Sequence, residues 1–411
     1  MNIEPPDFII ISGGSEIVGL ALAEAAQVAG KRYVVLSLVA NSILRDTPAC
    51  VGIVDLSHLL HNWDALPEKF IGTLSKLSNL AARKLPIFPT EDGGLRLLNE
   101  CRDEVLKYGE FSRARALRMG GLDKAEIIEF ASTRGRGTCV STSIVLDDPT
   151  QAPAAIEKLG LDAVFKPALK PIHMDLSPLG NSGTKIVTQQ DHSESINSIV
   201  TRLSNAWAIS ERWIAQPRFN TGPNRERSVC AVRDQHGHVQ ARQVIERAKY
   251  PSTGGTAYWV CIDEHNDLLP SATSIMDAFE IIGVCELSYL PDAQGIAQLI
   301  EFNTRPWLQI GLMERSGFPI VASSIAALNG NKIEKTTFGD EYFHWMQLER
   351  FLVALSKGEC SARHTMEFVN ELTKKTTTVA GFGSSLPGIR WRLLARFIQK
   401  LHIRQRVSRQ N

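Results

Sequence analysis

The sequence predicts an α/β protein built from several subdomains, and three observations lead to that fold class. The chain opens with short apolar runs that flank a helix, as in a parallel βαβ unit. Its middle part alternates β-rich apolar runs with amphipathic helical segments. Its 411 residues exceed what one hydrophobic core usually organises, so two or three packed subdomains are expected.

The opening βαβ unit is expected to be Rossmann-like. Strands are predicted at Phe8 to Ser12 and Tyr33 to Leu38, with a glycine-containing turn and an Ala/Leu-rich helix between them. The turn lacks the GxGxxG spacing and no acidic residue follows the second strand, so we interpret it as structural rather than as a dinucleotide site. Further helices are predicted at 71–80 and 93–107.

Charge and cysteine content argue against several classes of protein. The net charge of +1 does not suit a chain that binds nucleic acid over its whole surface. The seven cysteines include no CxxC pair and mostly have apolar neighbours, which indicates reduced thiols rather than a zinc or redox motif. The N-terminus shows no pattern of a secretory signal, and no apolar run approaches the roughly 20 residues of a membrane span. The protein is therefore expected to be cytoplasmic.

Two β-rich runs near residue 290 carry the residues with the clearest chemical meaning. Glu286 lies on the first run, and Glu301 and Asn303 lie on the second. If the runs pair as antiparallel strands, these side chains can point to one place, because residues i and i+2 share a strand face. Two carboxylates and an amide oxygen suit Mg²⁺ or Mn²⁺. Simple solvation is the alternative, and the apolar neighbours of both glutamates disfavour it.

The segment from Glu286 to Trp307 resembles the paired-strand motif of the ATP-grasp superfamily, in which an acidic residue and a Glu-x-Asn-x-Arg run hold Mg·ATP. By this resemblance the motif residues are Glu286, Glu301, Asn303 and Arg305. Thr304 stands where the family commonly has proline, which removes no ligand. Within the superfamily the chain most resembles the bacterial carboxylate–amine ligases, the group that includes D-aspartate ligase.

Upstream segments match the same family in the expected order. The resemblance puts lysines on the nucleotide phosphates at Lys124, which begins a predicted helix, and at Lys166, which lies in an apolar strand. An unpaired ammonium in such a strand would be costly, which favours a functional role for Lys166. A Gly/Ser-rich loop follows, whose backbone N–H groups can wrap phosphate oxygens. The loop residues expected to bind are Gly180, Ser182, Gly183 and Thr184.

The segment 213–219 resembles the strand that edges the adenine ring in this family. Gln216 is the expected contact, although Pro217 stands where family members often have a glutamate. Proline has no N–H, so the base must be hydrogen-bonded differently. Glu226 is the candidate for the ribose, with Glu211 as an alternative.

The segment 247–256 carries a further match, to the ligase subgroup. Arg247 and Lys249 precede a Pro and a Gly-Gly pair, and can receive a carboxylate or an acyl phosphate. Arg305 can instead clamp a phosphate or a developing oxyanion. A plain hairpin loop is an equal alternative. The expected subdomains are 1–111 (pre-grasp), 112–205 (ATP-grasp N-lobe), 206–335 (C-lobe with the metal site) and 336–411 (helical region with a basic tail).

The tail from Gly388 to the last residue contains seven Lys and Arg residues and no acidic one. Its apolar residues recur at helical spacing, so it can form a basic amphipathic helix. Such a helix can lie on an anionic membrane surface or dock on the body of the protein, and the sequence leaves both open.

The resemblance implies an enzyme that forms C–N bonds. ATP phosphorylates a bound carboxylate, and an amine then displaces phosphate from the acyl phosphate. Two alternatives stay open: another ATP-grasp enzyme, such as a carboxylase or a phosphotransferase, and a nucleotide-binding pseudoenzyme. The expected partners are small-molecule substrates and no nucleic acid, and the sequence leaves a homodimer open.

Overall fold

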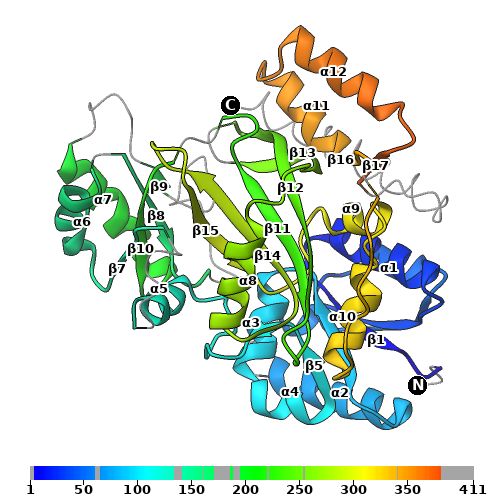
Figure 1. The fold of residues 1–411 in the computed structure, drawn as a ribbon. Coiled ribbons are helices and arrows are strands. Elements are labelled where there is room, and N and C mark those ends of the chain that lie inside the picture. Colours follow the sequence, from blue (N-terminus) through cyan, green and yellow to red (C-terminus); the bar gives the residue numbers. More distant parts are fainter. Residues whose placement is uncertain are drawn as a thin grey trace, which may run out of the picture.

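The computed structural model of the chain describes residues 4–60, 65–133, 141–160, 162–170, 186–187, 195–219, 222–252, 255–339 and 341–380. Its strands form three sheets, which Figure 1 shows from one side together with the helices that cover them. The α/β class predicted from the sequence is confirmed. No helix within these ranges is long and apolar enough to cross a membrane.

The first sheet is parallel, with the strand order β3-β2-β1-β4-β5. Its strands are β1 (Phe8–Ser12), β2 (Tyr33–Ser37), β3 (Cys50–Asp55), β4 (Leu85–Pro89) and β5 (Gly109–Phe111). Its helices are α1 (Glu16–Val28), α2 (Leu66–Ala81), α3 (Asp92–Glu100) and α4 (Arg102–Tyr108). Phe8 and Ile10 pack into one core and Ile9 and Ile11 into another, because successive strand residues face opposite sides. The single helix predicted over 93–107 is two helices that meet at Cys101.

The second sheet is antiparallel, in the order β7-β10-β8-β9. Its strands are β7 (Ile144–Leu146), β8 (Ala163–Pro167), β9 (Ile186–Val187) and β10 (Trp213–Pro217). One face packs on the helices α6 (Ala152–Leu159) and α7 (Ile196–Ala206), around the buried Phe165 and Trp213. Helix α5 (Lys124–Thr133) lies on the other face, where Ala125 contacts Ile214.

The third sheet has the order β15-β14-β11-β12-β13-β16-β17. Its strands are β11 (Arg227–Arg233), β12 (Val239–Tyr250), β13 (Thr256–Ile262), β14 (Ile281–Pro291), β15 (Ala297–Asn303), β16 (His344–Met346) and β17 (Thr377–Val379). The helices packed against it are α8 (Leu269–Ala278), α9 (Ile310–Arg315) and α10 (Ile320–Leu328). Along β11, Val229 and Ala231 face α8, and Cys230 and Val232 face the opposite core.

The C-terminal region was expected to be helical, and the structure adds two strands to it. The helices α11 (Leu348–Ser356) and α12 (Ala362–Leu372) pack against β13 through Tyr258, Trp259 and Phe368. Strands β16 and β17 extend the third sheet beyond β13. The predicted basic tail falls within residues 381–411, outside the described part of the chain.

The first and third sheets share one hydrophobic core. Residues of β1 and α1 pack in it together with residues of β11, α9 and α10. The short strand β6 (Arg113–Ala114) also pairs with the start of β14, at Ile281 and Ile282. These two connections fix the parallel sheet against the third sheet, with the carboxyl ends of β1 and β4 facing it.

Candidate functional site

A cavity of about 420 Å³ lies between the carboxyl edge of the first sheet and the third sheet. Ser15, Thr90 and Glu91 line it from the loops that follow β1 and β4. In parallel sheets this edge is the usual place for a bound ligand, because loops diverge there and leave a crevice. The charged and amide residues that line it from the third sheet and its flanks are Glu226, Glu246, Glu286, Glu301, Asn303, Arg305, Gln309 and Arg350.

The paired strands β14 and β15 bring together the three residues proposed from the sequence to hold a metal. Glu286 lies directly opposite Asn303, whose Nδ2 donates to Glu286 Oε2 at 3.3 Å. Glu301 pairs with Ser288, and all these residues line the cavity. The described residues contain no group of three or more His, Cys, Asp or Glu side chains able to hold a metal. Two carboxylates and one amide still fit Mg²⁺, which takes its remaining ligands from phosphates and water.

The two glutamates of this cluster have opposite pKa shifts. Burial, followed by the nearby charge of Glu226, raises the pKa of Glu286 to about 7, although Arg305 and Asn303 oppose the shift. Burial acts the same way on Glu301, but the ammonium groups of Lys124, Lys170 and Lys166 outweigh it. The pKa of Glu301 falls to about 2. Glu301 is therefore a fixed anion at neutral pH, surrounded by cations from the second sheet and its flanks.

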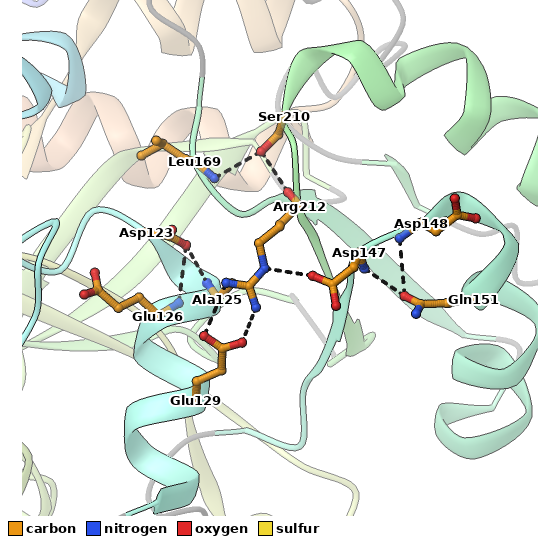
Figure 2. A network of polar contacts seen from close by, with 10 residues as sticks. All are labelled: Asp123, Ala125, Glu126, Glu129, Asp147, Asp148, Gln151, Leu169, Ser210 and Arg212. Atoms are coloured by element: carbon orange, nitrogen blue, oxygen red, sulfur yellow. Dashed lines mark hydrogen bonds and ion pairs between the residues drawn. The ribbon is translucent and has the colours of Figure 1, made fainter.

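Lys124 reaches this site from the start of α5, where local contacts fix it. Its backbone N–H donates to the carbonyl of Ala168 at 2.9 Å, and its Nζ lies 3.4 Å from Glu301 Oε1. Asp123 accepts from the N–H of Ala125 at 2.9 Å and caps the helix (Figure 2). The helix is thus held against the second sheet, with its first residue beside Glu301.

Arg212 ties α5 to the strands beneath it, as Figure 2 also shows. Its guanidinium bonds both carboxylate oxygens of Glu129 on α5 and, at 3.0 Å, Asp147 after β7. A bidentate arginine fixes geometry better than a lysine would, because its donors form a rigid fork. Lys166 lies on β8, and its charge contributes to the low pKa of Glu301.

Arg305 is held by Asp92, a residue that no motif in the sequence marks as functional. The Nε and Nη2 atoms of Arg305 lie 2.7 and 2.6 Å from Asp92 Oδ1, and Lys170 Nζ lies 3.3 Å from Oδ2. Burial opposes ionisation of Asp92, but the charges of Arg305 and Lys170 overcome it and hold its pKa far below the usual range. Asp92 follows β4 of the first sheet and therefore contacts both the segment after β8, at Lys170, and the segment after β15, at Arg305.

Lys249 and Glu226 also meet, but Arg247 lies elsewhere. Lys249 Nζ is 2.8 Å from Glu226 Oε2 and 3.0 Å from Glu246 Oε1, and both glutamates line the cavity. Arg247 lies over the ring of Trp259, 5.7 Å from its centroid, and does not line the cavity. The irregular register of β12 between Glu246 and Lys249 explains this, because the bulge brings Lys249 to the face of Glu246 while Arg247 stays on the opposite face. The expectation that Arg247 and Lys249 act together does not fit this geometry.

Gln216 is buried beside a smaller cavity of about 30 Å³ between the second and third sheets. Its Nε2 donates to Ser141 Oγ at 3.0 Å and to Ser143 Oγ at 2.9 Å. Lys124, Glu301 and Asn303 line the same cavity, together with apolar side chains such as Ile128 and Leu299. Its lining combines apolar and polar groups, but a volume of about 30 Å³ has room for water and not for a nucleobase. The loop residues Gly180, Ser182, Gly183 and Thr184 lie outside the described residues.

Glu91 lines the large cavity from the first sheet, although no motif in the sequence marks it as functional. Its Oε2 accepts from the N–H of Gly14 at 2.7 Å, and Thr90 Oγ1 accepts from the N–H of Gly13 at 3.0 Å. Burial raises the pKa of Glu91. The position of Glu91 could have indicated a site residue. It directly follows β4, whose carboxyl end lies beside the carboxyl end of β1.

We expect Gly13→Ala to lower the free energy of unfolding by about 1–2 kcal/mol, because the new methyl displaces Glu91. A Cβ at Gly13 would lie 1.7 Å from Glu91 Oε1, so the carboxylate must leave the N–H of Gly14. Urea denaturation measures the change. Gly72→Ala is the control, because a Cβ there meets nothing within 4 Å and alanine favours the helix α2. An unchanged stability of Gly13→Ala would contradict the proposed packing.

Comparison with known structures identifies the fold. The structure is similar to an N5-carboxyaminoimidazole ribonucleotide synthetase in complex with ADP, with a TM-score of 0.62 and 16% identity over 87% of each chain. It is also similar to N5-carboxyaminoimidazole synthetase from Staphylococcus aureus, with a TM-score of 0.60 and 16% identity over 87% of this chain and 88% of that chain. The chain therefore has the ATP-grasp fold.

A biotin carboxylase from Campylobacter jejuni in complex with β,γ-ATP shares this fold. The TM-score is 0.57, with 17% identity over 80% of this chain and 72% of the carboxylase. No protein-family model and no curated protein sequence matches the chain. At this level of identity the likeness establishes the fold, and the chemistry has to be argued from the site itself.

Proposed function

We propose that the protein is an ATP-dependent ligase that joins a carboxylate to an amine, as in the D-aspartate ligase group. The main support is that Glu286, Glu301 and Asn303 line one cavity and that the charges of three lysines act on Glu301. Adjacent cations and metal-type ligands suit the phosphates of Mg·ATP. The fold shared with structures that hold ADP or an ATP complex supports the same reading.

In this proposal each side chain has a distinct role. Glu286, Glu301 and Asn303 would hold Mg²⁺, and the ion would supply positive charge to the phosphate oxygens. Lys124 and Lys166 bind the phosphates, and Gln216 and Glu226 contact the nucleoside. The backbone proposed to cover the phosphates belongs to Gly180, Ser182, Gly183 and Thr184.

The proposed reaction has two steps. A carboxylate oxygen of the first substrate attacks the γ-phosphorus, the bond to the β-phosphate oxygen breaks, and ADP leaves. The amine nitrogen then attacks the acyl carbon of the resulting acyl phosphate, phosphate leaves with the bridging oxygen, and the nitrogen loses a proton. Neither step needs a side-chain nucleophile, so the protein acts by positioning and by charge. Arg305 is the cation proposed to stabilise the transferred phosphoryl group, with Asp92 fixing its orientation.

A carboxylase is the second candidate, favoured by the names of the structural neighbours. Bicarbonate can be phosphorylated by the same chemistry, so the site geometry serves both reactions. The two candidates differ in which carboxylate supports ADP formation. The substrates of the neighbours are not assigned to this chain by fold alone.

Trapping with hydroxylamine tests the proposal. We expect ATP, Mg²⁺ and the correct carboxylate to give one hydroxamate per ADP, because hydroxylamine attacks an acyl phosphate. The panel contains the amino acids, simple carboxylic acids and bicarbonate, each with and without candidate amines. ADP formation that requires bicarbonate alone would select the carboxylase. Nucleotide binding without turnover over the whole panel would refute the enzymatic proposal in favour of a binding module.

A further inference from the structure

A second and larger cleft, of about 630 Å³, lies at the opposite edge of the first sheet. Lys84 lines it immediately before β4, and Glu110 lines it from β5. Ile282 of β14 and Leu328 at the end of α10 complete the wall. None of these residues takes part in the site described above, so the cleft needs an explanation of its own.

The cleft has an excess of positive charge. Its lining contains four cations and one carboxylate: Arg83, Lys84, Arg113, Arg115 and Glu110. Arg83 pairs with Asp7 at 3.1 Å and Arg113 pairs with Glu110 at 2.9 Å. Among the described residues, Lys84 and Arg115 have no ion-pair partner, and both are exposed at the cleft. Two unpaired cations beside a buried arginine favour an anionic ligand.

Arg113 is the buried and fixed member of this cluster. Its side chain is 10% exposed, and its guanidinium lies over the ring of Phe111, 5.1 Å from the centroid. Nη1 donates to Glu110 Oε2 and to the carbonyl of Phe111, each at 2.9 Å. Within the described chain, its Nε and Nη2 make no hydrogen bond, which leaves two donors of a rigid fork for a ligand.

The opposite wall suits an organic group rather than a bare ion. Ile282 and Leu328 give it apolar surface, and Asn329, Asn331 and Gln235 add amide groups. Gln235 is anchored by a 2.9 Å bond from its Nε2 to the carbonyl of Gly330. The volume is within the range of small-molecule pockets, about 300–1,000 Å³, and far exceeds that of one phosphate.

We propose that this cleft is a second ligand site, which binds a small phosphorylated organic molecule. The phosphate lies against Arg113, Arg115 and Lys84, and the organic part packs on Ile282 and Leu328. The ligand would contact β14 at Ile282, four residues before Glu286 on the same strand. The occupant is thus a small metabolite that is distinct from the nucleotide of the central site.

Calorimetric titration of the full-length protein with glucose 6-phosphate tests this site. A non-hydrolysable ATP analogue with Mg²⁺ is kept saturating, so that the central cavity is filled. We expect glucose 6-phosphate to bind, and the double variant Lys84→Gln, Arg115→Gln to weaken binding about tenfold or more, because two charged contacts are lost. Inorganic phosphate should bind more weakly than the sugar phosphate, since it cannot reach the apolar wall.

Two control proteins make the result decisive. Lys84→Arg, Arg115→Lys keeps both charges and should retain binding, and Arg363→Gln removes an exposed charge on α12 and should change nothing. Failure of both probes to bind the wild-type protein would overturn the proposal. So would equal affinity in the wild type and the charge-removing variant. If inorganic phosphate bound as tightly as glucose 6-phosphate, the proposed contact between the organic part of the ligand and the apolar wall would be refuted.

Discussion

Glu301→Gln should lower ATP-dependent turnover by at least about 100-fold. The substitution keeps the shape of the side chain but removes the fixed negative charge at the centre of the proposed metal site. Without it, the proposed Mg²⁺ site would lack one ligand, and Lys124 would lose the partner that lies 3.4 Å away. The measurement is ADP formation at saturating ATP, repeated over a range of Mg²⁺ concentrations.

A matched control separates loss of chemistry from loss of fold. Glu264→Gln removes an exposed carboxylate from the loop after β13 and should leave turnover unchanged. The thermal unfolding curve of Glu301→Gln should remain cooperative, since its side chain is a third exposed. Full activity in a folded Glu301→Gln protein would remove the central support of the proposed function.

Asp92→Asn should lower the free energy of unfolding by about 2–3 kcal/mol at neutral pH. The change leaves Arg305 without its carboxylate while the guanidinium stays largely buried. Asp103→Asn is the control, because Asp103 is exposed on α4 in the same part of the fold. Equal stability losses in the two variants would contradict the role given to the pair of Asp92 and Arg305.

The pH dependence of the Asp92→Asn effect has a defined sign. The folded-state pKa of Asp92 lies far below the usual range, so its stabilising contribution is complete above the unfolded pKa of about 3.9. It is lost as the pH falls below that value. The difference in unfolding free energy between the wild type and Asp92→Asn should therefore be constant from about pH 5 to 8 and shrink below about pH 4. Urea titrations at several pH values measure it.

The metal-type cluster could be predicted from the sequence because its geometry is local. Glu286, Glu301 and Asn303 lie on two strands joined by a short hairpin, so strand alternation and one turn nearly determine their meeting. The opening βαβ unit was predictable for the same reason. Its apolar runs and its turn follow one another along the chain.

Contacts across the fold could not be predicted in this way. Asp92 and Arg305 are 213 residues apart, and no periodic pattern relates them. Lys170 meets Asp92 only because the second sheet closes onto the first. The bulge in β12 was equally hidden, and it moves Lys249 to the face of Glu246, away from that of Arg247. A single inserted residue reverses the face of a side chain without altering composition or hydrophobicity.

Strand β16 has a practical consequence for anyone who shortens the chain. It pairs with Trp259, Val260 and Cys261 of β13, so it covers the outer backbone groups of that strand. A shortened form that ends near residue 335 would leave β13 as a long apolar border with unpaired N–H and C=O groups. Borders of this kind recruit other chains, and aggregation follows. Residues 341–380 therefore belong in any shortened form of the protein.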